Sequence, residues 1–245
     1  MGIYHNILKN KKEGKKIFAI LIDPDKQSNE ELLFSIENAN QSNVDYFFVG
    51  GSLLIYDALE KCIQTIKENS NIPVVLFPGN TMQVSQSADA ILFLSLISGR
   101  NPDMLIGNQV ITAPILKQTS LEIISTGYIL VDSGKPTTVS YISNTNPIPY
   151  EKNDIAACTA MAGELLGLKL IYADGGSGAL NPISAKMIQE ISENINTPLI
   201  VGGGICSAEK AIENCNSGAD IIVVGNAIEK DPKLIKEISE AIHSI

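Results

Sequence analysis

The sequence predicts an α/β fold, a single (β/α)8 barrel of the TIM type that spans residues 1–245 as one domain. Three observations predict it. The length of 245 residues is close to that of one such barrel. Eight short apolar runs rich in β-branched residues alternate with helix-like stretches at fairly even spacing. Nearly every run ends in glycine, usually with Ser or Asp beside it, as expected where barrel strands end at a functional mouth.

The predicted strands read as continuous apolar runs, which is typical of parallel strands covered on both faces. In chain order they are Ile17–Ile22, Tyr46–Val49, Val74–Phe77, Ile91–Leu96, Gly127–Val131, Lys169–Ala173, Leu199–Val201 and Ile221–Val224. Eight strand–helix units in one chain favour a closed barrel over an open doubly wound sheet.

Helix-like segments separate the strands, and several carry start signals. They are Asn29–Gln41, Leu53–Glu68, Asn153–Leu166, Ile183–Glu193, Ala208–Asn216 and Pro232–Ile242. Ser28 and Ser207 stand where N-caps are expected, and Asn181-Pro182 offers a cap followed by proline in the first turn. Between the third and fourth strands, Pro78–Asp89 is short and rich in Gly, Asn, Ser and Gln, so we expect an irregular or missing third helix there.

Composition excludes several classes of function. The net charge of −9 disfavours a nucleic-acid binder. The four cysteines show no zinc-type spacing, which indicates reduced thiols in a cytoplasmic protein. No signal peptide or membrane span is apparent in the sequence. His5 and His243 stand near the ends of the sequence, which argues against a histidine-based relay.

Two glycine turns after the seventh and eighth strands are the strongest functional signal. Gly202-Gly203-Gly204 and Gly225-Asn226 stand where barrels of this type bind phosphate. Glycine lets backbone N–H groups approach an anion closely, and a following helix N-terminus adds a favourable dipole. The alternative is that these glycines only make tight turns. The pair predicts a phosphate site at the barrel mouth.

The loop after the sixth strand is a candidate for a small polar ligand. It comprises Tyr172, Ala173, Asp174, Gly175, Gly176, Ser177 and Gly178. An ionised Asp174 only accepts hydrogen bonds, so it suits a substrate hydroxyl better than a phosphate. Asp174 could instead satisfy N–H groups of its own loop.

Asp23, at the end of the first strand, is a candidate ligand for Mg²⁺, because hard carboxylate oxygens suit this ion. The hydroxyl of Ser52, after Gly50-Gly51, is a further candidate ligand. Asp before proline is also an ordinary turn residue, and Ser52 could cap a helix beginning at Leu53. Arg100, the only arginine, lies past the fourth strand and is a candidate partner for a second phosphate group; the alternative is a solvated loop charge.

Five motifs together resemble the geranylgeranylglyceryl phosphate synthase family. They are Leu21-Ile22-Asp23-Pro24-Asp25-Lys26, Gly50-Gly51-Ser52, Ser98-Gly99-Arg100-Asn101-Pro102, Tyr172 to Gly178, and Val201-Gly202-Gly203-Gly204-Ile205. The resemblance covers essentially the whole chain in order. It implies a prenyltransferase that joins sn-glycerol 1-phosphate to a prenyl diphosphate, most often geranylgeranyl diphosphate, through an ether bond.

The resemblance also implies roles for particular residues. Asp23 and Ser52 would hold Mg²⁺, while Tyr172 to Gly178, Gly203-Gly204 and Gly225-Asn226 would surround glycerol 1-phosphate. Many members carry Glu and Ala where this chain has Asp174 and Gly175, so the distance from the carboxylate to the nucleophile is open. The family commonly forms dimers, so the resemblance implies a homo-oligomer with a dimer favoured. Release of a lipid product suggests peripheral contact with a membrane. The apolar tail would lie along Phe77–Met82, Ile91–Leu96 and Met104–Ile115, although these side chains could be plain core.

Two rival functions fit the same fold. One is another phosphate-barrel enzyme, such as a sugar-phosphate isomerase, in which Asp23 and Asp132 would form an acid–base pair across the mouth. The other is a non-catalytic barrel that binds a phosphorylated lipid precursor. The first leaves the Ser-Gly-Arg-Asn-Pro and Tyr-x-Asp-Gly-Gly-Ser-Gly motifs without a role.

Overall fold

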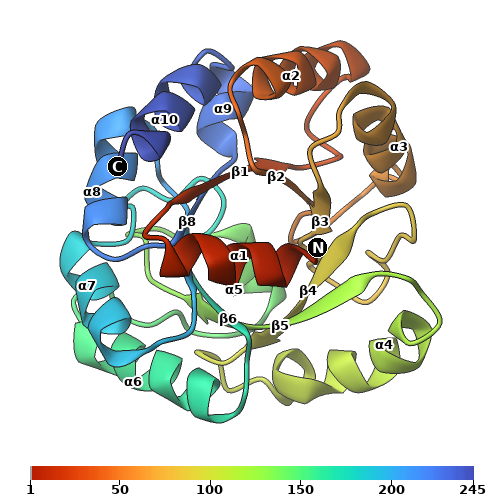
Figure 1. The fold of residues 1–245 in the computed structure, drawn as a ribbon. Coiled ribbons are helices and arrows are strands. Elements are labelled where there is room, and N and C mark those ends of the chain that lie inside the picture. Colours follow the sequence, from red (N-terminus) through yellow and green to blue (C-terminus); the bar gives the residue numbers. More distant parts are fainter. Residues whose placement is uncertain (1) are drawn as a thin grey trace.

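A computed structural model describes residues 2–245 and shows a closed barrel of eight parallel strands in sequential order, as predicted (Figure 1). The strands are β1 (Ile17–Ile22), β2 (Tyr46–Val49), β3 (Val74–Leu76), β4 (Ala90–Leu96), β5 (Glu122–Leu130), β6 (Leu170–Asp174), β7 (Leu199–Gly202) and β8 (Ile221–Val224). Pairing of β1 with β8 closes the sheet. The fifth strand is longer than expected and begins five residues earlier.

Helices surround the barrel (Figure 1). They are α1 (Ile3–Lys12), α2 (Asn29–Gln41), α3 (Leu59–Asn69), the π-helical turn η1 (Asp103–Gly107), α4 (Asn108–Leu116), α5 (Thr138–Ile142), α6 (Asn153–Leu165), α7 (Ala185–Asn194), α8 (Ala208–Asn216), α9 (Asn226–Lys230) and α10 (Leu234–His243). Within residues 2–245, no helix has both the length and the apolar character that crossing a bilayer requires.

The predicted helix starts are confirmed at two places and wrong at two others. Ser28 and Ser207 accept hydrogen bonds from the third residue of α2 and α8. The cap of α7 is Ser184 rather than Asn181. The third predicted helix begins at Leu59 instead of Leu53, because the preceding residues form an irregular loop at the barrel mouth.

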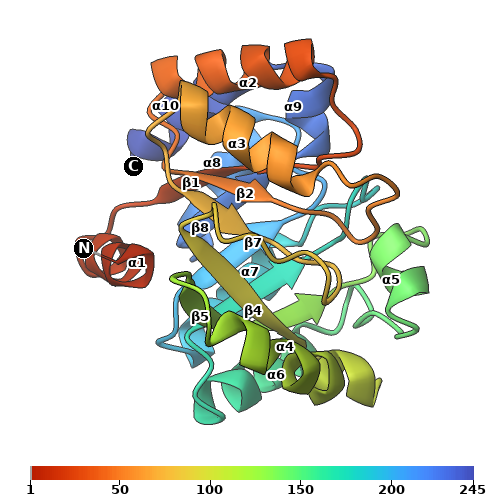
Figure 2. The same ribbon diagram turned by 90° about the vertical axis from the view of Figure 1, so that its right-hand side faces the viewer.

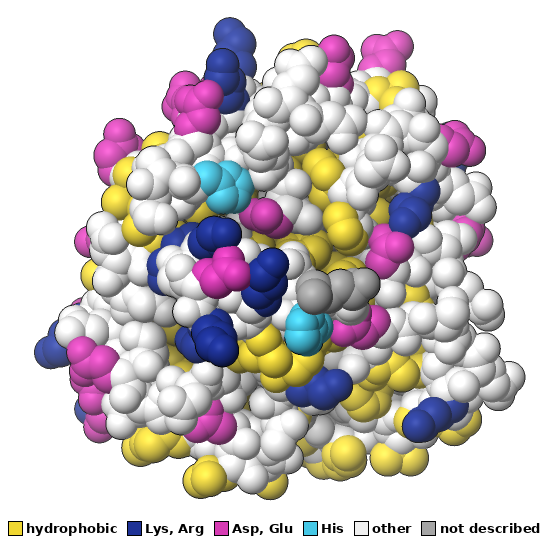
Figure 3. Space-filling view, viewed as in Figure 1, with side chains coloured by type: hydrophobic (Ala, Val, Ile, Leu, Met, Phe, Trp, Pro, Cys, Tyr) yellow, Lys and Arg dark blue, Asp and Glu magenta, His cyan; other side chains and the backbone are white. Residues whose placement is uncertain are grey.

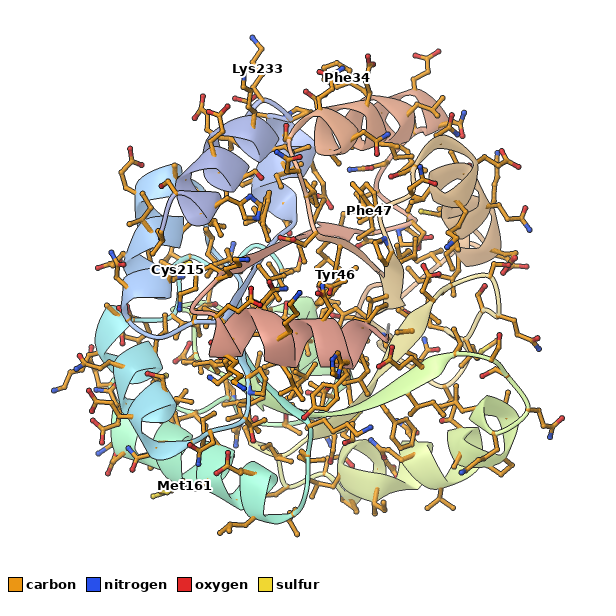
Figure 4. The ribbon with its side chains drawn as sticks, in the orientation of Figure 1. Phe34, Tyr46, Phe47, Met161, Cys215 and Lys233 are labelled. Carbon is orange, nitrogen blue, oxygen red and sulfur yellow. The ribbon has the colours of Figure 1, made fainter. Side chains whose placement is uncertain are left out.

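Alternate residues of each strand face the two apolar layers of the core. Phe18 and Phe47 belong to the layer between sheet and helices, whereas Ala19 and Tyr46 belong to the layer that includes the barrel interior. Figure 4 shows Tyr46 near the centre of the barrel and Phe47 on the side of the strand toward the helices. All four residues of β2 are buried, which explains why the strands read as unbroken apolar runs.

The third barrel helix is missing, as the thin Pro78–Asp89 segment predicted. No helix lies between β3 and β4 in the described part of the chain, and loops take its place between α3 and α4 (Figure 1). Gln83 fixes this segment, since its buried side chain accepts from Gly79 N at 3.1 Å and donates to Gly51 O at 2.8 Å. The wall of the barrel is therefore thinnest beside β3 and β4.

An N-terminal helix that the sequence did not reveal covers the far end of the barrel. Figure 2 shows α1 at one end of the strands and α5 at the other. The Glu122 carboxylate accepts the free backbone N–H groups of Ile3 and Tyr4 and so caps α1. Dark blue Lys side chains gather beside this helix in Figure 3, and the last turn of α1 supplies Lys9, Lys11 and Lys12. The opposite end, where the strands finish, remains available for a site.

His243 makes part of the stability of the C-terminal helix depend on pH. Its Nε2 lies 3.0 Å from Asp45 Oδ2, and its Nδ1 lies 3.2 Å from Ser239 Oγ, which itself donates to a carbonyl. The hydrogen bond to Asp45 raises the pKa of His243 above its usual value. The stabilisation is therefore fully present below about pH 6.5 and is lost as pH rises through the higher folded-state pKa.

His243→Gln should therefore destabilise the protein more at pH 6 than at pH 9. A partly exposed pair of this kind contributes about 1 kcal/mol, or roughly 2–4 °C in melting temperature for a domain of this size. Thermal unfolding at both pH values measures the difference, with His5→Gln, on the exposed side of α1, as control. An equal loss at both pH values would contradict the assignment.

Candidate functional site

A cavity lies at the ends of the strands, where the glycine-rich turns meet. Six predicted site residues line it: Asp23, Ser52, Asp174, Ser177, Gly225 and Asn226. They come from the turns after β1, β2, β6 and β8, which lie far apart in sequence. Their convergence follows from the closed barrel, because it brings the carboxyl ends of all the strands to one face.

Asp23 lies at the polar end of this cavity, where one carboxylate oxygen accepts a hydrogen bond and the other forms an ion pair. Its Oδ1 accepts the backbone N–H of Asp25 at 3.2 Å, and its Oδ2 lies 3.0 Å from the Lys26 ammonium. A Cβ at Gly51 would lie only 3.2 Å from Asp23 Oδ2, so glycine lets the β2 turn approach this carboxylate closely. Asp23 and the Ser52 turn are therefore neighbours.

Ser52 belongs to the cavity and does not cap a helix. The helix that follows begins at Leu59, and its N-cap is Ala58. The turn before Ser52 is held by Gln83, whose Oε1 accepts the Gly51 N–H at 3.3 Å. The alternative role of Ser52 as a helix cap is thus wrong.

The oxygen atoms of Asp23 and Ser52 form a small set of hard donors that suits Mg²⁺. In residues 2–245 no group of three or more His, Cys, Asp and Glu side chains has a metal-binding arrangement. An ion held only by Asp23 and Ser52 would take its other ligands from substrate phosphates and water, which is the usual pattern for Mg²⁺.

Asp174 is buried at the end of β6 and faces the cavity. Its Oδ1 accepts the Gly176 N–H at 2.8 Å, and its Oδ2 accepts the Tyr128 hydroxyl at 2.5 Å. Burial raises the pKa of Asp174, while these two hydrogen bonds oppose the rise. The alternative role for Asp174, satisfying its own loop, holds in part, because one oxygen does bind the Gly176 amide.

Tyr128, which binds Asp174, belongs to a cluster of three aromatic rings. The Phe77 and Tyr172 rings stack with centroids 5.1 Å apart, and the Tyr128 ring meets Tyr172 edge-on at 5.5 Å. Phe77 and Tyr128 line the cavity, whereas Tyr172 is almost completely buried and, like Ala173, does not line it. Tyr128 was missed in the sequence because it stands inside a predicted strand; its register partner is Tyr172.

The glycine turn after β7 is shaped to leave N–H groups free. Gly203 and Gly204 have φ angles of +84° and +72°, in the left-handed region that favours glycine. Across residues 2–245, the N–H groups of Gly203, Gly204, Asn226 and Ala227 donate to no acceptor within the protein. Free donors at both predicted turns are what an anion site requires.

A short hydrogen-bond chain joins three turns at the mouth. The Lys26 ammonium donates to Ser177 Oγ at 3.2 Å, and Ser177 Oγ donates to Asn226 Oδ1 at 2.9 Å. Lys26 was not proposed as a site residue from the sequence. Its position in the Asp-Pro-Asp-Lys motif, near the predicted metal ligand Asp23, could have indicated it. Burial also raises the pKa of the nearby Glu229 carboxyl, which lines the cavity.

Other predicted site residues, Gly203 and Gly204 among them, are not part of the cavity lining. Gly175, Gly176 and Gly178 shape the loop after β6, and the Gly176 and Gly178 φ angles are +83° and +71°. Arg100 is exposed, and its guanidinium donates to Gly99 O at 2.8 Å. The structure thus does not bring Arg100 to the polar end, and a phosphate contact of Arg100 stays a prediction. Asp132 is also exposed, accepts the Gly134 N–H and is absent from the cavity lining that includes Asp23, so the structure does not support the acid–base pair of the isomerase hypothesis.

The cavity continues from its polar end into an apolar arm beneath the thin wall. Side chains from all three segments predicted to hold a tail line it, among them Phe77, Ile91, Phe93, Leu94 and Met104, and Leu116 adds a side chain just beyond the third segment. The turn η1, whose π-helical geometry is often found at functional sites, supplies Met104. One cavity therefore joins a polar end, lined by Asp23, Lys26 and Asn226, to an apolar pocket.

Comparison with known proteins agrees with this geometry. A model of the PcrB family matches residues 5–242. The geranylgeranylglyceryl phosphate synthase of Chitinophaga pinensis is 55% identical over 99% of this chain and 96% of its own length. That of Methanosphaera stadtmanae is 39% identical over 99% of this chain and 100% of its own. The crystal structure of (S)-3-O-geranylgeranylglyceryl phosphate synthase from Thermoplasma acidophilum, in complex with its substrate sn-glycerol-1-phosphate, covers both chains completely with a TM-score of 0.94 and 30% identity.

Proposed function

This chain belongs to the PcrB family, and we propose that it transfers a geranylgeranyl group from geranylgeranyl diphosphate to sn-glycerol 1-phosphate. The product is an ether lipid precursor, and diphosphate is released. The observation that carries the proposal is one cavity in which the free Asn226 N–H and the side chains of Asp23, Lys26 and Asp174 meet an apolar arm. The turn of Gly203 lies directly behind Asp174. A sugar-phosphate isomerase has no use for such an arm.

The acceptor, glycerol 1-phosphate, binds at the two glycine turns. The free N–H groups of Gly203, Gly204 and Asn226 supply donors for the phosphate. Ser177 adds a hydroxyl, and Asp174 receives a hydrogen bond from the glycerol hydroxyl that reacts. The acceptor is thus held at both ends, which supports the orientation that bond formation requires.

The donor diphosphate binds toward Asp23, Ser52 and Lys26, with its tail in the apolar arm. Asp23 and Ser52 are the residues that would hold Mg²⁺, and this ion supplies charge neutralisation of the diphosphate when it is bound. The Lys26 ammonium lies 3.0 Å from Asp23 Oδ2 and adds a second positive charge beside the diphosphate. An acidic protein can in this way accept two phosphorylated substrates.

The transfer depends more on the orientation of the acceptor hydroxyl than on the basicity of Asp174. The bond between the prenyl C1 and the diphosphate oxygen breaks, and a bond from C1 to the glycerol oxygen forms. The hydroxyl proton passes to the Asp174 carboxylate, while the diphosphate takes the electrons of the broken bond. Positive charge builds on the allylic carbon as the leaving group departs, so a strong base is unnecessary. Asp174 therefore acts chiefly by aligning the hydroxyl and accepting its proton.

Gly203→Ala should weaken acceptor binding. A methyl group there would lie 2.7 Å from Asp174 Oδ1 and 2.8 Å from Gly175 N, so the phosphate turn and the carboxylate would be displaced. We expect kcat/KM for glycerol 1-phosphate to fall about tenfold or more, since small displacements of a reacting group are costly. Steady-state kinetics with the acceptor varied measures this.

Gly167→Ala is the matched control for this substitution. Its φ of +83° imposes nearly the same backbone strain, and nothing lies within 4 Å of the added methyl. Both variants should lose similar stability from the left-handed backbone, about 1–2 kcal/mol. Equal kinetics in the two variants would show that Gly203 matters only for the turn.

An extraction assay tests the proposed function directly. The protein is incubated with Mg²⁺, glycerol 1-phosphate and labelled geranylgeranyl diphosphate, and the labelled product is extracted and identified. An ether-linked product supports the synthase. Binding of both substrates without product would favour the non-catalytic barrel, and repeating the assay with shorter and longer prenyl diphosphates defines the chain length. Omitting Mg²⁺ and adding a chelator tests the proposed metal dependence.

A homo-oligomer, with a dimer favoured, is supported by one exposed apolar stripe. Ile106 of η1 and Val110, Ile111 and Ile115 of α4 are each more than half exposed. Contiguous apolar surface of this kind often marks an interface between proteins. Peripheral contact with a membrane at product release stays a prediction.

A further inference from the structure

Among residues 2–245, Tyr128 makes the one side-chain hydrogen bond to the Asp174 carboxylate, which orients the acceptor. Its hydroxyl donates to Asp174 Oδ2 at 2.5 Å, and both side chains are less than a tenth exposed. The other oxygen of Asp174 is held by the Gly176 backbone N–H. We propose that Tyr128 is a positioning residue for the transfer reaction, whose hydroxyl keeps the Asp174 carboxylate ionised and aimed at the acceptor. This inference rests on the proposed function.

The direction of the hydrogen bond follows from the chemistry of the pair. Burial and the Asp174 charge raise the pKa of Tyr128 well above its usual value, so the phenol keeps its proton and acts as donor. A donor to a carboxylate favours its charged form, and the hydrogen bond from Tyr128 works against the rise in the Asp174 pKa that burial causes. The carboxylate then retains lone pairs for the glycerol hydroxyl.

In the part of the chain that the structure describes, no cation forms an ion pair with Asp174 that could take over this task. Tyr128 of β5 and Tyr172 of β6 are the titratable groups that couple to it. On the β7 side its neighbour is Gly203, which has no side chain. The charged groups that share the cavity are Asp23, Lys26 and Glu229, and none of them makes a hydrogen bond or ion pair with Asp174 among residues 2–245. The ionised state of Asp174 therefore depends on hydrogen bonds.

The aromatic cluster fixes the phenol in place. The Tyr128 ring meets Tyr172 edge-on at 5.5 Å and lies 6.0 Å from Phe77. Tyr128 and Tyr172 are direct register partners on adjacent strands. The hydroxyl thus sits on rigid barrel strands rather than on a loop, as precise positioning requires. This arrangement also suits Asp174, whose side chain is shorter than the Glu of many family members, because the long Tyr128 side chain extends to its carboxylate.

Tyr128→Phe removes only the hydroxyl and keeps the ring packing. A hydrogen bond to a charged group is lost, so kcat/KM for glycerol 1-phosphate should fall about tenfold to a hundredfold. The acid limb of the pH profile should move to higher pH, because Asp174 without its donor takes up a proton more readily. Activity lost at low pH should return in part as pH rises.

Tyr46→Phe is the matched control, since Tyr46 is a buried barrel tyrosine whose hydroxyl binds Asn6 instead. It should leave the pH profile in place. Carbon-13 NMR of the Asp174 carboxyl carbon, assigned with Asp174→Asn, gives a second readout that needs no activity. A rise in its titration midpoint in Tyr128→Phe, together with the shifted acid limb, supports the inference.

Two results would overturn it. The first is an unchanged Asp174 midpoint in Tyr128→Phe, even if activity falls. The second is a changed midpoint with an unchanged pH profile and kcat/KM, because the contact would then have no part in the reaction. Absence of transfer by the wild-type protein would instead refute the proposed function, and the NMR comparison would still decide whether Tyr128 sets the Asp174 proton affinity.

Discussion

Asp23→Asn is expected to reduce prenyl transfer at least a hundredfold while leaving the fold intact, because neutralisation of a departing diphosphate is worth several kcal/mol. The substitution keeps the shape and the hydrogen bond from the Asp25 N–H but removes the negative charge. The neutral amide oxygen that remains is a much weaker ligand for Mg²⁺ than a carboxylate. Initial rates across a Mg²⁺ titration, with thermal unfolding to check the fold, measure the effect.

Asp132→Asn is the control for this experiment. Asp132 is an exposed carboxylate near the end of β5, and an amide oxygen can still accept from the Gly134 N–H. It should retain normal turnover, whereas an acid–base pair of Asp23 and Asp132 would predict a loss in both variants. Near-normal activity of Asp23→Asn with Mg²⁺ present would refute the metal assignment.

Asp174→Ala should lower turnover about a hundredfold to ten-thousandfold, the usual range for a positioned proton acceptor. The affinity for glycerol 1-phosphate should fall much less, because the free N–H groups of the glycine turns still hold the phosphate. The Tyr128 hydroxyl would also lose its acceptor, so some loss of stability is expected. Single-turnover rates and acceptor binding, measured separately, distinguish the two effects.

Asp174→Asn refines this test, since it keeps the volume and can still accept from Tyr128. If it binds the acceptor normally but does not turn over, the negative charge is what the reaction needs. Turnover equal to that of the wild type in both Asp174 variants would remove Asp174 from the mechanism. A loss confined to acceptor affinity would leave it a binding residue only.

Local features of the sequence predicted the barrel because each strand carries its own evidence. Ile17–Ile22 and Ile221–Val224 are continuous apolar runs, and their observed bounds are those expected. The Pro78–Asp89 segment predicted the missing helix, because it is short and lacks the apolar face that a covering helix needs. The helix α1 was not predicted, because its Lys-rich sequence has few apolar residues. Its cap is Glu122, which lies far along the chain and gives no local start signal. The start of α3 was misplaced because apolar Leu53 and Ile55 read as helix, yet both are exposed at the mouth.

For the candidate site, too, some features follow from the sequence and others only from the tertiary structure. By itself, the sequence determined which residues stand at strand ends, including Asp23, Asp174 and the two glycine turns, because strand ends are marked locally by glycine and polar side chains. Only the tertiary structure decided which of them meet. It brings Lys26 to Asp23 and Ser177, pairs Tyr128 with Asp174 across 46 positions of sequence, and leaves Arg100 outside the cavity lining. The physical reason is that contacts between strands depend on register and on the direction of each side chain, which the closing of the barrel sets for all strands at once.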